Sequence, residues 1–280
     1  MRTRIISALV GLVIVFAVLF FHNTIVLPIA VAVIIGIMLY ELLRAVKMHK
    51  CLPVLCAVEL GGVCVPILYD LNMENIIFPI CLVSVFAVFL TWLRNHKEYK
   101  YDQIMFSLAC MVLIPNSMTT LVKLDRYHES YGIVLLILGL AGAWLADSGA
   151  YFTGVAIGKH KLCPEISPKK TIEGFVGGIL TNAVLFVAID IVYSRFFADG
   201  HSMPKLSACL VMAVAGAVCG VVGTIGDLSA SMIKRQIGFK DYGNIMPGHG
   251  GMMDRFDSVL FVAPTFYAFI SLVLGEMRFN

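Results

Sequence analysis

Long apolar stretches, separated by short polar segments, run through all 280 residues of the chain. Each stretch is close to the roughly 20 residues that an α-helix needs to cross a bilayer. The pattern predicts an all-α polytopic membrane protein with about nine transmembrane helices. The predicted spans lie at about 5–21, 24–43, 52–70, 76–93, 103–121, 131–157, 172–193, 206–228 and 256–275.

Two of these spans carry additional signals. In the stretch 103–121, Pro115 and the two polar residues that follow it favour a broken or re-entrant helix. The stretch 5–21 follows two arginines and therefore has the look of a signal peptide. No small-x-small cleavage site comes after it, so an uncleaved first span is the better prediction.

Composition agrees with a membrane protein and argues against a soluble domain. The chain is 59% hydrophobic and 14% charged, with a mean hydropathy of +0.89. Soluble domains are about half apolar and a quarter charged. The eight cysteines lie mostly inside apolar stretches, which indicates small buried residues and not a disulfide framework.

The charge of the segments between spans alternates along the chain. Segments rich in Lys and Arg alternate with weakly charged ones, and basic segments stay on the cytoplasmic side of a membrane. The alternation predicts a cytoplasmic N-terminus and a C-terminus outside. It also places the two most basic segments, 159–171 and 229–257, on the same cytoplasmic face.

Polar groups inside the spans divide the chain into two parts. Residues 1–125, with about five spans, hold few of them: Glu41, near a span end, is expected to reach the membrane interface, and Glu59 has no assigned role. Residues 126–280, with about four spans, hold many more. We therefore predict an N-terminal transmembrane scaffold and a C-terminal catalytic part. The polar residues in or beside the later spans are Asp147, Glu173, Asn182, Asp190 and Asp227.

Pairs of glycines four residues apart recur in the C-terminal part. This spacing lets helix backbones approach closely, so we expect the pairs to serve helix packing. The pairs are Gly154 with Gly158, Gly174 with Gly178, and Gly216 with Gly220.

Ionisable residues are concentrated in segment 229–257, although they are scarce in the rest of the chain. Charges at a membrane boundary need partners or a ligand, so the cluster indicates a functional site. The alternative is a solvated loop between two spans. The cluster consists of Lys234, Arg235, Lys240, Asp241, His249, Asp254, Arg255 and Asp257.

Asp227 stands near the cytoplasmic end of the eighth predicted span. A carboxylate inside a span costs about 2.5–3.5 kcal/mol on insertion scales unless it binds something. A structural ion pair with Lys234, seven residues further on, would satisfy it. Ligand binding is the preferred interpretation, because other carboxylates are expected nearby.

Asp254 and Asp257 lie three residues apart where the last predicted span begins. The helix dipole favours acidic residues at a helix start, which is the simpler explanation. Gly250 and Gly251 precede them, however, and glycine-rich turns let backbone N–H groups face an anion. Carboxylates beside a phosphate-binding loop, without a set of Cys and His, predict nucleotidyl or phosphoryl transfer with Mg²⁺ and not Zn²⁺.

Lys169 and Lys170 lie between Ser167 and Thr171, just before the seventh predicted span. A basic loop touching anionic lipid would explain the two lysines. Ser and Thr also favour helix N-caps, which would place the lysines at a helix start suited to a triphosphate. The two interpretations have similar weight.

Two further residues belong to the predicted site. Asp147 lies too deep inside the sixth span to be solvated, and a lysine of the following loop would satisfy it. His249 stands between glycines; such a residue more often orients a phosphate or packs than acts as an acid or base.

These motifs resemble the signature of the phosphatidate cytidylyltransferase (CDP-diacylglycerol synthase) family. The resemblance covers residues 140–260 by motif and the remainder by the number of spans. It is carried by Ser231-Met-Ile-Lys234-Arg235, Lys240-Asp241, Pro247-Gly-His249-Gly250-Gly251, Asp254-Arg255-Phe-Asp257, Ser167-Pro-Lys-Lys-Thr-Ile-Glu-Gly174 and Asp147-Ser-Gly-Ala-Tyr151.

The resemblance implies an enzyme that converts CTP and phosphatidate to CDP-diacylglycerol and pyrophosphate. It implies dependence on Mg²⁺, with a second cation left open, and a homodimer among the lipids of a bacterial cytoplasmic membrane. The active site would face the cytoplasm, with no nucleic-acid partner. By motif position the metal ligands would be Asp227, Asp254 and Asp257, and the other catalytic residues Lys234, Arg235 and His249. The implied substrate-binding residues are Ser167, Lys169, Lys170, Asp147, Lys240, Asp241, Gly250, Gly251 and Arg255.

Three other functions are alternatives to this one. A CTP-dependent polyprenol kinase would release CDP in place of pyrophosphate. An ion-coupled transporter would carry inverted repeats and mid-membrane charges, whereas no repeat is visible and the acids gather at one face. A structural membrane scaffold would leave the segment rich in glycine and carboxylates unexplained.

Overall fold

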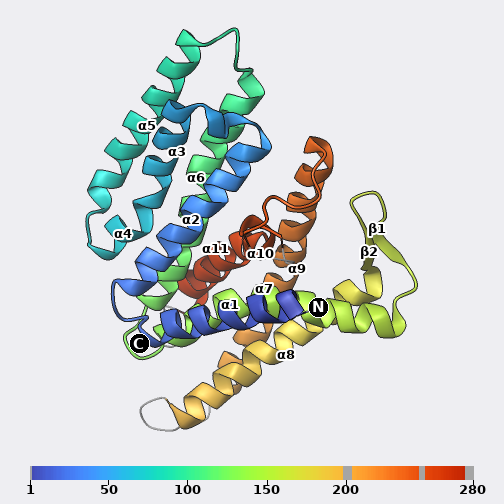
Figure 1. Ribbon diagram of the computed structural model, residues 1–280. Coiled ribbons are helices and arrows are strands. Elements are labelled where there is room, and N and C mark those ends of the chain that lie inside the picture. Colours follow the sequence, from blue (N-terminus) through green and yellow to red (C-terminus); the bar gives the residue numbers. More distant parts are fainter. Residues whose placement is uncertain (1, 198–203, 246–249, 275–280) are drawn as a thin grey trace. The chain divides into compact units, whose positions relative to one another are not determined.

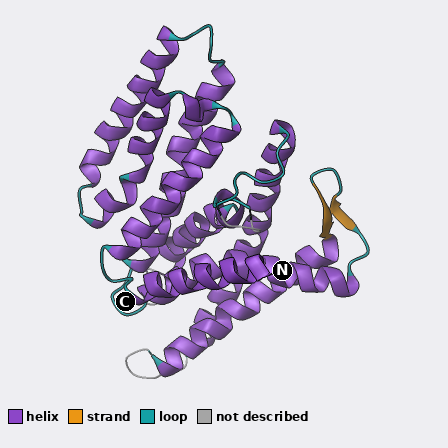
Figure 2. Ribbon diagram, viewed as in Figure 1, coloured by secondary structure: helices purple, strands orange, loops and turns teal. Residues whose placement is uncertain are grey.

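The computed structural model describes residues 2–197, 204–245 and 250–274, with side chains from residue 9 to residue 272. Helices make up most of this part of the chain (Figures 1 and 2). In chain order the elements are α1 (Arg2–Phe20), α2 (Val26–Ala45), η1 (Met48–Lys50), α3 (Leu52–Val63), α4 (Val65–Asp70), α5 (Glu74–Arg94), α6 (Tyr101–Asp125), α7 (Gly132–Ile157), β1 (Lys161–Cys163), β2 (Ser167–Thr171), α8 (Ile172–Phe196), α9 (Leu206–Ile237), α10 (Met253–Phe256), α11 (Val259–Phe269) and η2 (Ile270–Leu274).

The prediction of an all-α polytopic membrane protein is confirmed. Within the described residues, eight helical segments are long and apolar enough to cross a membrane, and they match the second to ninth predicted spans. The first predicted span corresponds to α1, whose described apolar part is Leu9–Phe20. The orientation of the termini stays a prediction.

One predicted helix break is wrong, and another occurs where none was expected. The helix α6 runs without interruption from Tyr101 to Asp125, with Pro115 inside it. The span 52–70 is divided at Cys64 into α3 and α4 instead, and Pro66 lies in the first turn of α4. A proline is tolerated in the first turn because the N–H groups there have no partner within the helix.

The chain forms two compact units. The first contains residues 1–122 together with 236–256, and the second contains residues 123–235 together with 257–280. The first unit is therefore discontinuous in sequence, since a segment from the C-terminal half of the chain belongs to it. The two units are defined by packing, so the predicted division into a scaffold, residues 1–125, and a catalytic part, residues 126–280, stays a prediction.

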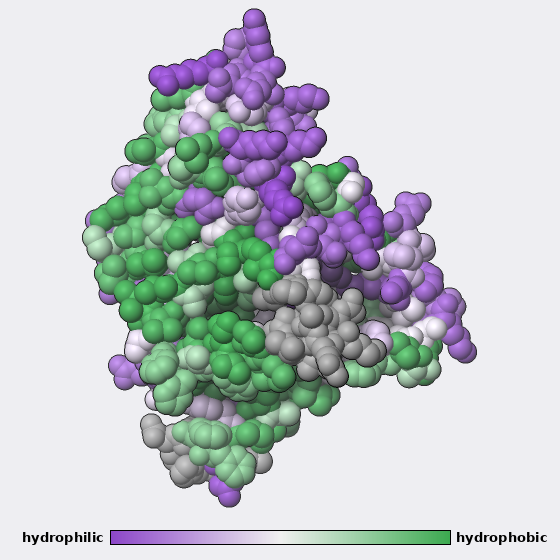
Figure 3. Space-filling view, in the orientation of Figure 1, coloured by the Kyte–Doolittle hydropathy of each residue, from purple (hydrophilic) through white to green (hydrophobic). Residues whose placement is uncertain are grey.

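Helices of the first unit bear apolar side chains on their outer surface, as lipid contact requires. Figure 3 shows these side chains covering the middle of its helices, with polar residues gathered at the loop between α5 and α6. In the most apolar 18-residue stretch of α5, only 11% of the residues are buried. The large exposed side chains on α5 include Phe78, Val83, Phe86, Leu90 and Leu93. In water this surface would be a liability, whereas in a bilayer it faces lipid tails.

Close approach of helices in the second unit depends on glycine. A Cβ added at Gly178, in α8, would lie 2.7 Å from the backbone oxygen of Ala146 in α7. One added at Gly216, in α9, would lie 2.7 Å from the backbone oxygen of Asn182 in α8. Asn182 Nδ2 also donates to the Gly216 backbone oxygen over 2.9 Å. The predicted packing role of the spaced glycines is confirmed at these positions.

Gly216→Ala is expected to lower the free energy of unfolding by about 1–3 kcal/mol, because the new methyl group would press on the backbone of α8. The measurement is the thermal unfolding midpoint of the purified protein in detergent. Gly11→Ala is the control, since a Cβ at Gly11 would meet no atom within 4 Å. Equal midpoints for the two variants would contradict the packing role.

Candidate active site

A short hairpin between α7 and α8 carries the first group of predicted site residues. Its strands β1 and β2 pair antiparallel, with Lys161 opposite Thr171 and Cys163 opposite Ser167. Sequence reasoning expected a helix start here but no sheet. The helix start is confirmed: the Thr171 hydroxyl accepts from Gly174 N at 3.1 Å and caps α8.

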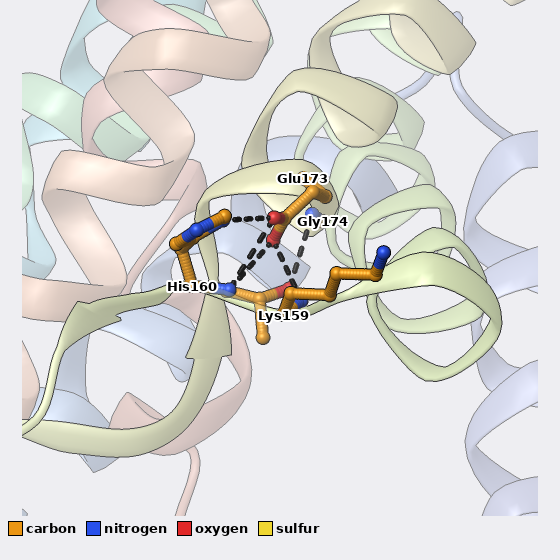
Figure 4. A network of polar contacts seen from close by, with 5 residues as sticks. Lys159, His160, Glu173 and Gly174 are labelled. Carbon is orange, nitrogen blue, oxygen red and sulfur yellow. Dashed lines mark hydrogen bonds and ion pairs between the residues drawn. The ribbon is translucent and has the colours of Figure 1, made fainter.

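The carboxylate of Glu173 holds the residues that lead into β1 against the start of α8 (Figure 4). It accepts hydrogen bonds from the backbone nitrogens of Lys159 at 3.0 Å and His160 at 3.2 Å. Its other oxygen lies 2.6 Å from His160 Nδ1. These contacts fix the direction in which β2, and with it Lys170, leaves the helix.

Glu173→Ala is expected to raise amide hydrogen exchange in residues 159–171, because the variant removes the acceptor for two backbone N–H groups and the partner of His160. Exchange in α7 should stay unchanged. The measurement is exchange followed by mass spectrometry, with Glu165→Ala, an exposed acid of the same hairpin, as control. An unchanged rate in 159–171 would contradict the anchoring role.

Lys170 connects two of the predicted acids in the second unit. Its Nζ lies 2.5 Å from Asp227 Oδ2 and 3.9 Å from Asp147 Oδ1. The Lys170 side chain is 22% exposed and that of Asp227 24%, so the pair is largely shielded from water. The pairing of Asp147 with a lysine of the following loop is confirmed. The sequence suggested Lys234 as an ion-pair partner for Asp227, whereas the structure pairs Asp227 with Lys170.

Asp257 is the third acid of this group. It is 7% exposed, and one of its carboxylate oxygens accepts from Ser258 N at 2.7 Å. Its charge interacts with those of Asp227, Lys234 and Asp147. The Ser258 hydroxyl reaches Asp147 Oδ2 at 3.5 Å. Two helices, α7 and α9, and the turn that leads into α11 thus contribute acids to one cluster of charges.

Gly226 allows α9 to pass against the backbone that carries Asp257. A Cβ at this position would lie 2.8 Å from the Asp257 backbone oxygen and 3.2 Å from Ser258 Cα. Any larger residue would therefore separate Asp227, the next residue of α9, from the start of the last span.

Asp254 lies in the first unit, where its side chain holds the backbone at two described positions before α10. Its Oδ2 accepts from Tyr242 N at 2.9 Å and from Gly251 N at 3.0 Å. Gly250 has φ +87°, and a Cβ there would lie 3.0 Å from the same carboxylate oxygen. Asp227 and Asp257 belong to the second unit, so the predicted meeting of Asp254 with Asp227 stays a prediction.

The remaining predicted residues are mostly on the surface. Ser167 in β2 and Lys234 near the end of α9 are half-buried. His249 falls outside the described residues. The exposed members of the set are Lys169, Arg235, Lys240, Asp241 and Arg255.

Sequence reasoning missed one residue that holds this loop. Glu41, in α2, was expected to reach the membrane interface, but its side chain is only 1% exposed. Its two carboxylate oxygens accept from Met252 N at 3.0 Å and Met253 N at 2.8 Å. An acid inside an apolar span was the available signal, but its partners lie 211 and 212 residues away in the sequence.

The chemistry of the second-unit cluster suits a hard cation. Carboxylate oxygens are the ligands that Mg²⁺ prefers, and Asp227 and Asp147 already approach one cationic group, the Lys170 ammonium. In residues 2–197, 204–245 and 250–274, however, no three His, Cys, Asp or Glu side chains are grouped so as to hold a metal ion. The donor set therefore fits Mg²⁺ in kind, and a metal role stays a proposal.

Fold and site together define a polytopic helical membrane protein in which α7, α9, β2 and the turn before α11 contribute to a cluster of carboxylates and a lysine. The model of the cytidylyltransferase family matches residues 2–273. The chain belongs to this family of nucleotidyltransferases.

Three curated relatives illustrate the similarity, and each is named phosphatidate cytidylyltransferase. The protein of Bacillus subtilis is 35% identical over 201 residues, which cover 72% of this chain and 69% of the relative. That of Thermotoga maritima is 31% identical over 215 residues, 76% of each chain. That of Haemophilus influenzae is 37% identical over 175 residues, 61% of this chain and 58% of the relative.

Proposed function

We propose that the protein transfers the cytidylyl group of CTP to phosphatidate and so makes CDP-diacylglycerol. The observation that carries the proposal is the cluster of Lys170 with Asp227, Asp147 and Asp257, which lies in the segment bearing the family motifs. Family membership and the names of the relatives support the same reaction.

The proposed reaction exchanges one phosphoanhydride bond for another. An oxygen of the phosphatidate phosphate attacks the α-phosphorus of CTP, and the bond from that phosphorus to the oxygen bridging to the β-phosphate breaks. Pyrophosphate leaves with the electron pair of that bond. The attacking phosphate is already anionic at neutral pH, so no strong base is required.

The protein's part is to bring two anions together and to neutralise charge on the reacting groups. The Lys170 ammonium would supply part of this positive charge, and its ion pairs with Asp227 and Asp147 support that role. Glu173 fixes the hairpin that carries it. The exposed side chains of Lys169 and Lys240 add positive charge that attracts the triphosphate and the lipid phosphate.

Mg²⁺ would be held by Asp227 and Asp257, and it would stabilise negative charge on the phosphates as a Lewis acid. The role of Asp254 as a metal ligand stays a prediction. The proposal places the site on the cytoplasmic face of a bacterial inner membrane, because CTP is water-soluble while the acyl chains of phosphatidate stay in the leaflet. The protein is further proposed to act as a homodimer.

The deciding experiment supplies purified protein with phosphatidate and CTP labelled on the α-phosphate, and measures labelled lipid and pyrophosphate. We expect equal amounts of both products. We also expect chelation by EDTA to abolish turnover and Mg²⁺ to restore it. Release of CDP with a phosphorylated lipid alcohol would identify a kinase instead, and undiminished turnover in EDTA would exclude the metal.

A further inference from the structure

The loop that carries Asp254 is anchored by a buried acid from α2, early in the chain. Glu41 is 1% exposed, and its oxygens each accept one backbone N–H of the α10 start, from Met252 at 3.0 Å and Met253 at 2.8 Å. An ionisable group buried this deeply is retained only where hydrogen bonds satisfy it. Both carboxylate oxygens of Glu41 therefore accept hydrogen bonds from the backbone of this loop.

The backbone at two glycines of the loop packs closely against the same carboxylate. A Cβ on Gly251 would lie 2.5 Å from both oxygens of Glu41, and one on Gly243 would collide with its Oε1. No real Cβ contact is that short, so the loop reaches Glu41 only because these positions lack a side chain. Glu41 therefore contacts the loop both before Gly250, at Gly243, and after it, at Gly251.

Two carboxylates each accept two of the four backbone N–H groups held in this way. Glu41 takes those of Met252 and Met253, while Asp254 takes those of Gly251 and Tyr242. The charges of Glu41 and Asp254 also interact. Asp254 thus reaches its position in a turn whose other end is tied to α2.

We propose that Glu41 is a positioning residue for the reaction, which holds the turn Gly250–Asp254 so that Asp254 and Arg255 point at the substrates. This role rests on the proposed function for its effect on catalysis. Neither glutamine nor aspartate can make both of these hydrogen bonds. Glutamine replaces one acceptor oxygen by an NH₂ group that would face an N–H, and the aspartate side chain is one methylene shorter.

The test uses full-length wild type, Glu41→Gln and Gly243→Ala, which displaces the loop while keeping Glu41 intact. Glu59→Gln, an acid of α3 outside the proposed site, is the control. Hydrogen exchange without substrates is measured in residues 250–256 and, for comparison, in α3 and α5. Steady-state kinetics then give kcat and KM for CTP and phosphatidate.

We expect both test variants to raise exchange in 250–256 while α3 and α5 keep wild-type rates. We also expect kcat to fall about 10- to 100-fold with a smaller change in KM, as for groups that orient a catalytic residue. The control should match wild type in both measurements. If Glu41→Gln fails to fold, Gly243→Ala decides the matter from the loop side.

Wild-type exchange and kcat in the variants would overturn the proposal. An equal rise of exchange in α3 and α5 would also overturn it, because Glu41 would then serve only general stability. A wild-type protein that makes no CDP-diacylglycerol would refute the proposed function, while exchange in 250–256 would still show whether Glu41 positions the turn.

Discussion

Asp227→Asn is expected to lower kcat for CDP-diacylglycerol formation by at least about 100-fold, the size of effect seen when one preorganised electrostatic group is lost from an active site. The change keeps the shape of the side chain and removes its charge. Lys170, 2.5 Å away, then loses the partner that fixes its ammonium, and the cluster loses a carboxylate proposed to hold Mg²⁺.

The measurement is product formation by purified protein, with the thermal unfolding midpoint recorded beside it. Glu165→Gln is the matched control, because it neutralises an exposed acid in the hairpin that carries Lys170. The unfolding midpoint of Asp227→Asn should remain close to wild type. Full activity would remove Asp227 from the site, and unfolding of the variant would assign it a structural role instead.

Lys170→Gln is expected to lower kcat by about 100- to 1000-fold, because it removes a cation that two acids hold near the reacting phosphates. It also leaves Asp227 and Asp147 without their shared counter-charge. The control is Lys161→Gln, an exposed lysine of β1, which should retain wild-type rates. A wild-type rate for Lys170→Gln would show that the ion pair serves structure alone.

A double variant distinguishes a shared role from two separate ones. Residues that act as a unit give strongly non-additive losses. Asp227→Asn combined with Lys170→Gln should therefore be little worse than either single change. Losses that multiply would mean that the two side chains act independently, despite their contact.

The spans and the local helix signals could be predicted from the sequence because each depends on neighbouring residues. Apolar length alone located eight membrane-crossing segments, and Thr171 was identified as a cap from residue type and position. Local signals failed where tertiary packing decides. Pro115 suggested a break, yet α6 continues through it, whereas the break at Cys64 was not expected.

Partners distant in sequence could not be predicted. Lys234 was the nearest basic partner for Asp227 along its helix, but the recorded ion pair joins Asp227 to Lys170, 57 residues earlier. Glu41 gave a signal as an acid within a span, while nothing in its neighbourhood pointed to Met252 and Met253. The sequence therefore predicts which residues are candidates for the site, but the contacts between them follow only from the fold.

The discontinuity of the first unit constrains how the protein is made. Its helices α1 to α6 leave the ribosome long before residues 236–256, which belong to the same unit. Domains generally begin to fold from the N-terminus during synthesis. Until the late segment arrives, the Glu41 carboxylate lacks the backbone donors of Met252 and Met253. Assembly of the first unit is thus completed only after residues 252 and 253 have been made. In a nascent chain truncated at residue 235, the Glu41 carboxylate would lack both backbone donors, and we expect quality-control proteases to degrade that chain faster.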